Sequence, residues 1–435
     1  MAMSWKQLVF YGSADARDLF VGLTARDPRN IEWQNELATS EYKLGDVNMY
    51  WGHYTEASQH FYASAELFKR YPEQKQSSIL SFVGEGSALY YQFWATTWLG
   101  YMQLLIGDSD AALAHVEVGH ELAQRVALAN PNDTIGRRNL GYSELFQCMV
   151  QRSRGTYAEA IEHCRSAVLT MKGLVAENAA NSRRQRDLAW AEIHLAWALA
   201  KVGSVAEATD TLRSAVAIDE SLVATDKKNI LWMWHLWTGY FHLAQGELKL
   251  GNINEAQAKC HASFGLVEPE ASRDVRNFQI RRALAFSHFC LGDVQKAQSN
   301  AGSALDSYQQ GIDLLEDISR SDSISALRKS DLTLGYLKVG NALVALGRKD
   351  EAVADFRKAA ALAQQIADAD PNNADWEWAL LWSEWRRVER GDEVAICLRD
   401  IVQRLQKLAR ENRLSADLAW LMPEAIARQG KQNGE

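Results

Sequence analysis

A glycine followed five residues later by an alanine recurs along almost the whole chain. The motif stands at Gly52, Gly107, Gly155, Gly203, Gly251, Gly292 and Gly347. Successive glycines are 55, 48, 48, 48, 41 and 55 residues apart, and a degenerate eighth unit follows at Gly391. Because 41 and 55 together make two periods of 48, we expect one helix to have lost about a turn and a half and its neighbour to have gained it. Such a period predicts stacked units rather than separate globular domains.

Each unit also carries small residues at fixed distances from its glycine. One stands seven positions before the glycine, and another stands seven positions after the alanine. Seven residues are two helical turns, so each spacing keeps the small residues on one face of a helix. The pattern predicts two closely packed helices in every unit. Asp-Pro and Asn-Pro pairs at Asp27, Asn130 and Asp370 predict the boundaries between units.

This order of a small residue, a glycine, an alanine and a second small residue resembles the tetratricopeptide repeat, which places a large residue between the last two. Phe61, Leu212 and Phe356 occupy that place, whereas Cys164, Cys260 and Ala301 fill it poorly. The resemblance covers about residues 14–411 and departs from the family in its period, 48 residues instead of about 34. It implies an all-α, right-handed α-solenoid of about eight helix-turn-helix repeats. Long-period bacterial arrays of this type are often fused to sensor or effector domains.

The resemblance divides the chain into three segments. We expect residues 1–26 to form an N-terminal capping or half-repeat helix, 27–411 the superhelical array, and 412–435 a C-terminal capping helix and tail. The array begins in the middle of a unit. Two interpretations follow: residues 1–26 are a genuine end cap, or the chain was separated from an upstream effector domain.

Composition argues against several classes of protein. The 47 basic and 55 acidic side chains give a net charge of −8 without a basic domain, which argues against nucleic acid as a partner. No apolar run is long enough for a membrane span, and the first residues do not resemble a signal peptide, so we expect a cytoplasmic protein. The 5 cysteines form no C-x-x-C pair and are expected to be reduced core residues.

Catalytic and metal-binding signatures are missing from the sequence. It holds no phosphate-loop, H-E-x-x-H or G-x-S-x-G motif, and the Gly-rich fragment at Gly84 lacks its third glycine, so we expect a loop there. Histidines beside Cys260 and Cys290 diverge on a helix, and His235 and His242 are expected to be structural. We therefore expect no enzyme, no cofactor and no metal site.

Tetratricopeptide repeats generally bind partners on the concave surface, which the first helix of each unit lines. Numbered from its small residues, this chain places aromatic side chains and two arginines there over units two to five. The expected partner-binding residues are Tyr90, Trp94, Tyr101, Arg138, Tyr142, Arg186, Trp190, Trp197, Trp234 and Phe241. The basic clamp with which some members grip acidic chaperone tails is absent. Aromatic and Arg side chains are typical of binding hot spots, yet tryptophans in a solenoid also pack between helices, and both interpretations remain open.

Two functions fit this pattern. The first is a non-enzymatic protein–protein interaction scaffold that binds a partner peptide or helix in the concave groove. The alternative is a ligand- or peptide-sensing regulatory module whose superhelix changes pitch and so controls an effector domain or a separate partner. A scaffold would bind with little change of shape, whereas a sensor would compact or loosen.

Overall fold

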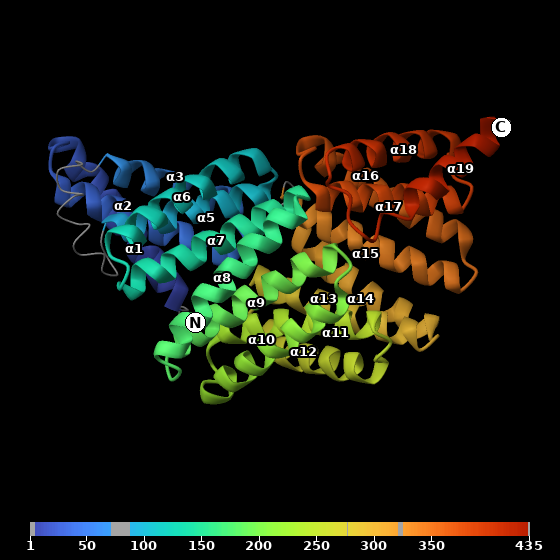
Figure 1. The fold of residues 1–435 in the computed structure, drawn as a ribbon, viewed down its shortest axis with the longest axis horizontal. Helices are drawn as coiled ribbons and strands as arrows, with labels where there is room; N and C mark the ends of the chain where they lie inside the picture. Colours follow the sequence, from blue (N-terminus) through green and yellow to red (C-terminus); the bar gives the residue numbers. More distant parts are fainter. Residues whose placement is uncertain (1–4, 71–87, 276, 321–324, 434–435) are drawn as a thin grey trace.

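The computed structural model describes residues 5–70, 88–275, 277–320 and 325–433, and all regular structure in these ranges is α-helical (Figure 1). The loop expected at Gly84 lies outside them. The helices are α1 (Trp5–Arg26), α2 (Ile31–Trp51), α3 (Tyr54–Lys69), α5 (Ala88–Ile106), α6 (Ser109–Ala129), α7 (Thr134–Arg154), α8 (Tyr157–Glu177), α9 (Ser182–Lys201), α10 (Val205–Thr225), α11 (Ile230–Lys249), α12 (Ile253–Arg273), α13 (Phe278–Ala297), α14 (Ala301–Ser319), α15 (Ala326–Ala345), α16 (Lys349–Ala369), α17 (Ala374–Glu389), α18 (Val394–Arg410) and α19 (Leu421–Asn433).

Each helix packs against the next along the chain, and the first helices of successive pairs also touch. The pairs run from α2 with α3 to α17 with α18, while α1 precedes them and α19 follows them. This is the all-α solenoid of helix pairs that the repeat predicts. None of the described helices is both long and apolar enough to cross a bilayer.

The turn inside a helix pair needs a residue in the left-handed conformation. Glycine supplies it with positive φ at Gly52, Gly107, Gly155, Gly203, Gly251, Gly347 and Gly391. A side chain at such a φ is strained, so glycine ends the first helix of the pair at low cost. Asparagine or aspartate starts the first helix of most pairs by accepting a backbone hydrogen bond, as Asn181 does from the N–H of Arg184.

One of the predicted motifs is not a turn. Gly292 lies inside α13, and Ser299, with φ 63°, forms the turn of that unit. Ser299 stands 48 residues after Gly251 and 48 before Gly347, so the expected shortened helix and its lengthened neighbour are wrong. Serine takes the glycine position because the turn's backbone bonds hold it, including one of 2.9 Å from the Ser299 N–H to the Lys296 carbonyl.

The predicted small residues lie where the two helices of a pair approach most closely. A Cβ on Gly45 would stand 2.7 Å from the Phe61 ring, and Gly292 and Gly340 face Tyr308 and Phe356 in the same way. The large residue is always sixteen positions after the small one. Tyr308 therefore fills the large-residue place in the sixth unit, which confirms the packing rule with the corrected register.

The expectation that all cysteines are reduced is wrong for four of them. Cys148 and Cys164 occupy the small and large places of one helix pair and form a disulfide between α7 and α8. Cys260 and Cys290 form a second one between α12 and α13, while Cys397 is free and buried. Sequence spacing did not indicate these bonds because each pair meets only when helices pack face to face.

The solenoid also touches itself across one superhelical turn. Helix α13 contacts α2, α15 contacts α5, and α17 contacts α7. Figure 1 shows the ends of the green helices of the middle units beside the orange and red helices of the last units. The seam, as we call this contact, joins the turns after α2, α5, α7 and α9 to the starts of α13, α15 and α17 and to the segment 413–416.

Candidate functional site

The ten predicted groove residues lie on α5, α7, α9 and α11, the first helices of four successive pairs, and none is exposed. We call this line of side chains the inner wall. Trp94, Tyr142 and Phe241 are buried, at 5%, 7% and 8% exposure, and the other seven are half-buried. The Trp94 ring packs edge-on against Tyr142, with 4.9 Å between ring centroids. Phe241 meets Phe286 of the next unit at 5.6 Å. These side chains therefore pack between helices in this structure.

A column of alternating tryptophans and histidines continues this wall on α9 and α11. His194 packs edge-on against Trp190 at 4.6 Å and against Trp197 at 4.7 Å. His235 stacks on Trp190 at 4.5 Å, and His242 packs on Trp197 at 4.3 Å. His235 and His242 were expected to be structural, and their packing agrees with that role.

The three imidazoles of this column are neutral. Burial, with added repulsion from nearby arginines, lowers the pKa of His235 and of His242 to about 3 and that of His194 well below its usual value. Neither ring nitrogen of His194 has a hydrogen-bond partner among the described residues. The column therefore packs by ring contacts rather than by ion pairs.

Two of the predicted groove arginines share one carboxylate. Arg138 Nε donates to Asp187 over 2.5 Å, and Arg186 donates to the same carboxylate over 2.6 Å. Tyr142 also donates its hydroxyl proton to Asp187, at 2.6 Å. The Arg138 guanidinium lies 4.8 Å from the Tyr142 ring centroid. The pKa of Asp187 is lowered: burial acts against ionisation, but the two arginines outweigh it.

Arg282 continues the line of inner-wall residues, and the sequence prediction missed it. It stands 48 residues after Trp234 and 144 after Arg138, and it donates to Asp331 over 2.5 Å as Arg138 does to Asp187. Both pairs join residues 49 positions apart. A constant period of 48 would have indicated Arg282, but the assignment of Gly292 as a turn shifted the register of this unit.

The interior between opposite walls is filled by the protein's own side chains. Tyr54 and Met102, from the first pairs, belong to one buried cluster with Phe241 and Phe286, and Tyr101 packs against it. Gln279 of α13 donates to the Tyr54 hydroxyl over 2.6 Å. A ligand that entered between these helices would have to displace these contacts.

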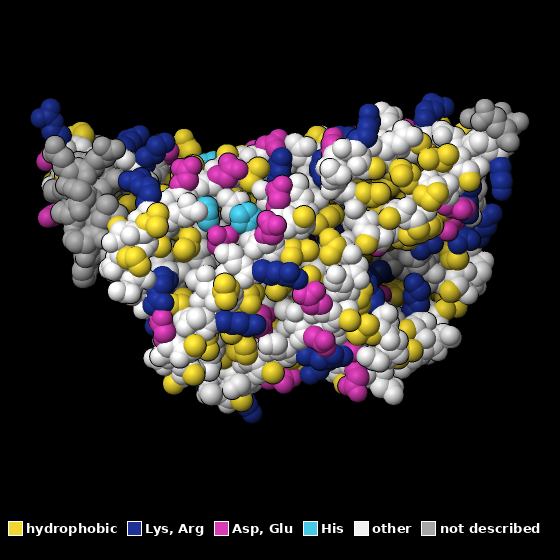
Figure 2. All heavy atoms as spheres, in the orientation of Figure 1, with side chains coloured by type: hydrophobic (Ala, Val, Ile, Leu, Met, Phe, Trp, Pro, Cys, Tyr) yellow, Lys and Arg dark blue, Asp and Glu magenta, His cyan; other side chains and the backbone are white. Residues whose placement is uncertain are grey.

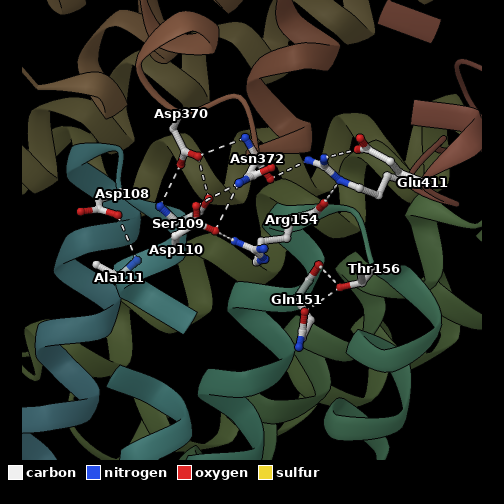
Figure 3. Close-up of polar contacts among 11 residues, drawn as sticks. Asp108, Ser109, Asp110, Ala111, Gln151, Arg154, Thr156, Asp370, Asn372 and Glu411 are labelled. Carbon is white, nitrogen blue, oxygen red and sulfur yellow. Dashed lines mark hydrogen bonds and ion pairs between the residues drawn. The ribbon is translucent and has the colours of Figure 1, made fainter. Parts of the chain in front are cut away.

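Polar contacts hold the top of the seam, and the close-up in Figure 3 draws them. Asp370, at the end of α16, accepts bonds from the backbone N–H of Ser109 at 2.9 Å and from its hydroxyl at 2.6 Å. Asn372 donates to Asp110, and Arg154 pairs with the same carboxylate. Loops more than 200 residues apart in the sequence thus meet here.

Arg413 ties together the loops that hold Arg154 and Asn372. Its guanidinium donates to the carbonyl oxygen of Arg154 at 2.5 Å and to that of Asn372 at 2.6 Å, and it pairs with Glu411 at 2.7 Å. The side chain is buried, with 9% exposure. Arg413 therefore provides hydrogen-bond donors for backbone carbonyl groups on both sides of the seam, and without it these carbonyls would need water as a partner.

Lower on the seam, one carboxylate bridges to two cations of the inner wall. Asp375 of α17 accepts a bond from Lys201 at 2.5 Å and pairs with Arg152 at 3.3 Å. The Arg152 guanidinium lies over the Trp197 ring, and the Lys201 ammonium lies over the Trp378 ring. The contact joins α7 and α9 to α17, so it links the predicted groove to the seam.

The outer surface offers weaker candidates. Basic, acidic and apolar side chains are interspersed over the face drawn in Figure 2. An open cleft between α16, α17 and α18 contains Arg404, whose guanidinium is already paired with Glu377 at 2.9 Å. Among the described residues, no three His, Cys, Asp or Glu side chains converge as metal ligands.

Comparison with known proteins supports the repeat family. A tetratricopeptide repeat model matches residues 335–366, which lie on α15 and α16. No curated protein sequence matches the chain. The apo form of RapI has a similar structure, with a TM-score of 0.50, 12% identity, and coverage of 92% of this chain and 99% of RapI.

Two further solved structures are similar at lower scores. NprR in complex with its cognate peptide NprX gives a TM-score of 0.47 at 13% identity, covering 83% of this chain and 88% of NprR. Aspartyl phosphate phosphatase F from Bacillus subtilis gives 0.44 at 15% identity, covering 88% and 92%. The matched repeat, the 48-residue period and the helix-pair packing together identify the chain as a tetratricopeptide repeat protein whose fold resembles that of RapI.

Proposed function

We propose that the chain is a non-enzymatic regulatory module that binds a peptide or a helical segment of a partner protein on its concave face. The observation that carries the proposal is the continuous inner wall of aromatic side chains and arginines on α5, α7, α9 and α11. Rings of this size supply large apolar contact areas, and Arg adds directional bonds to carboxylates or carbonyls.

The closed seam favours the sensing alternative over a rigid scaffold. A partner that enters the concave face must separate Tyr101 and Tyr54 from the cluster around Phe241. Binding is then coupled to the pitch of the superhelix, because the ligand stabilises only the open state. The effector that responds is either a separate protein or an attached domain.

The test is affinity capture from lysate of the source cell with the wild-type chain and with a triple variant, Trp94→Ala, Trp190→Ala and Trp197→Ala. Leu169→Ala, at an outer position with 73% exposure, is the matched control. We expect the control to retain the partners of the wild type and the triple variant to lose them while circular dichroism shows it helical. Partners that bind the folded triple variant as well as the wild type would refute a concave binding site.

A further inference from the structure

Cations outnumber carboxylates at two points of the inner wall. Asp187 is shared by Arg138 and Arg186, and Asp375 is shared by Arg152 and Lys201. In each group two cations therefore share one carboxylate. An interior with this surplus attracts anionic ligands.

The carboxylates of the two groups differ in their exposure to solvent. The side chain of Asp187 is 1% exposed, whereas that of Asp375 is 31% exposed. The cations differ less, at 11% and 16% for Arg138 and Arg186 against 14% and 23% for Arg152 and Lys201. Asp375 is therefore the carboxylate that a competing acidic group can approach from solvent.

Asp375 also belongs to the opposite side of the seam from the cations that it pairs with. It lies 174 residues after Lys201 in the sequence, and the Ala416 N–H donates to the Lys201 carbonyl beside it. The next carboxylate, Asp417, is exposed and already accepts bonds from Trp378 and Ser415. If a carboxylate of a ligand displaced the Asp375 side chain, both cations would stay paired and α17 would lose this contact with the inner wall.

We propose that Lys201 and Arg152 form the acceptor site for a carboxylate of an acidic partner peptide, and that Asp375 occupies this site in the free protein. The inference rests on the proposed function and names its ligand class. Charge complementarity indicates an acidic ligand, because Lys201 and Arg152 already bind one carboxylate and cations outnumber carboxylates on the inner wall. An acidic peptide that binds here separates α17 from α7 and α9, so recognition and opening of the seam are a single exchange.

The experiment measures the affinity of a fluorescein-labelled hexaglutamate peptide by fluorescence anisotropy at low salt. Asp375→Asn removes the internal competitor without changing the size of the side chain. We expect this variant to bind hexaglutamate at least about fivefold tighter than the wild type, because its site is no longer occupied. Glu351→Gln is the matched control, since Glu351 pairs only with its helix neighbour Arg348 among the described residues, and it should bind as the wild type does.

Two further arms make the result decisive. Lys201→Gln in the wild-type background should weaken hexaglutamate binding about fivefold, and this arm remains informative if Asp375→Asn fails to fold. Hexalysine of the same length should bind none of the variants. Equal affinities of Asp375→Asn and Glu351→Gln, an unchanged affinity of Lys201→Gln, or equal binding of hexalysine would each overturn the proposal.

The outcome is separable from that of the proposed function. One possible result is a partner whose binding requires Trp94, Trp190 and Trp197 but is equal for Asp375→Asn and the wild type. This result would overturn the acidic-ligand inference and would still support the concave binding site. Partner capture that ignores the three tryptophans would refute the concave site, whereas the hexaglutamate titration still decides whether the Lys201 pair accepts carboxylates.

Discussion

Asp219 of α10 is a buried acid without a partner. Its side chain is fully buried, and neither carboxylate oxygen has a hydrogen-bond partner among the described residues. Burial raises its pKa to about 8, while Arg186 acts in the opposite direction and Glu192 adds to the rise. At neutral pH the folded protein therefore holds Asp219 protonated. We predict that Asp219→Asn stabilises the protein.

The magnitude follows from the difference between the folded and unfolded pKa values. An unfolded Asp titrates near 3.8, so at pH 7 folding must bind a proton that the unfolded chain has released. At about 1.4 kcal/mol per pH unit, this costs about 4 kcal/mol at pH 7 and about 2 kcal/mol at pH 5. Because the folded-state pKa is raised, Asp219 costs no stability below the pKa of the unfolded chain, and the cost grows as pH rises towards the folded-state pKa of about 8. Asparagine keeps the shape and has no proton to bind.

Urea unfolding followed by circular dichroism at pH 5, 6, 7 and 8 measures this effect. We expect the variant to gain stability over the wild type at every pH, with a gain that grows by about 1.4 kcal/mol per unit between pH 5 and 7. Glu351→Gln, an exposed control, should follow the wild type throughout. A gain for Asp219→Asn that does not change with pH would refute the assignment of a neutral, buried carboxyl group.

Three further predictions concern the seam and the disulfides. Asp370→Asn removes the negative charge that accepts hydrogen bonds from the backbone N–H and the hydroxyl of Ser109. We expect the free energy of unfolding in urea to fall by about 2 kcal/mol and the radius of gyration from X-ray scattering to increase. An unchanged radius would contradict the role of this contact. Arg413→Ala leaves the Arg154 and Asn372 carbonyls without their donor; amide hydrogen exchange should accelerate in the loops after α7 and α16, and uniform protection would count against it. Alkylation of the denatured, unreduced protein should modify one thiol, that of Cys397, and five reactive thiols would exclude both disulfides. Loss of the Cys148–Cys164 disulfide, which closes a 16-residue separation, should lower the free energy of unfolding by about 3 kcal/mol in thermal unfolding.

The fold could be predicted because the features that build each repeat are local. The glycine turns and the small residues near them are set by backbone conformation and helix contact within one pair. The error in the register of the repeats arose where Ser299 replaces glycine at a left-handed turn and Gly292 has the same motif by coincidence. Turn chemistry therefore defines the register only while glycine occupies the turn.

The candidate site was predicted in part. Trp94 and Tyr142 do lie together because they occupy equivalent positions of neighbouring pairs, and Arg138 joins them because it lies one turn before Tyr142 on α7. The partners of these residues across the seam were not predictable, because the contact of Lys201 with Asp375 depends on the accumulated pitch of four repeats. A small change in the angle between neighbouring pairs would open or close this contact without altering any local pattern.

Zero-length carbodiimide cross-linking, read by mass spectrometry, tests the central claim most directly. The reagent joins an ammonium to a carboxylate in direct contact, and Lys201 and Asp375 are 2.5 Å apart across the seam. Lys338 and Asp293, 2.7 Å apart within neighbouring pairs, are the internal control. We expect both cross-links in the free protein, and only the control cross-link once an acidic peptide is bound. A control cross-link without the Lys201–Asp375 cross-link in the free protein would contradict the closed superhelix.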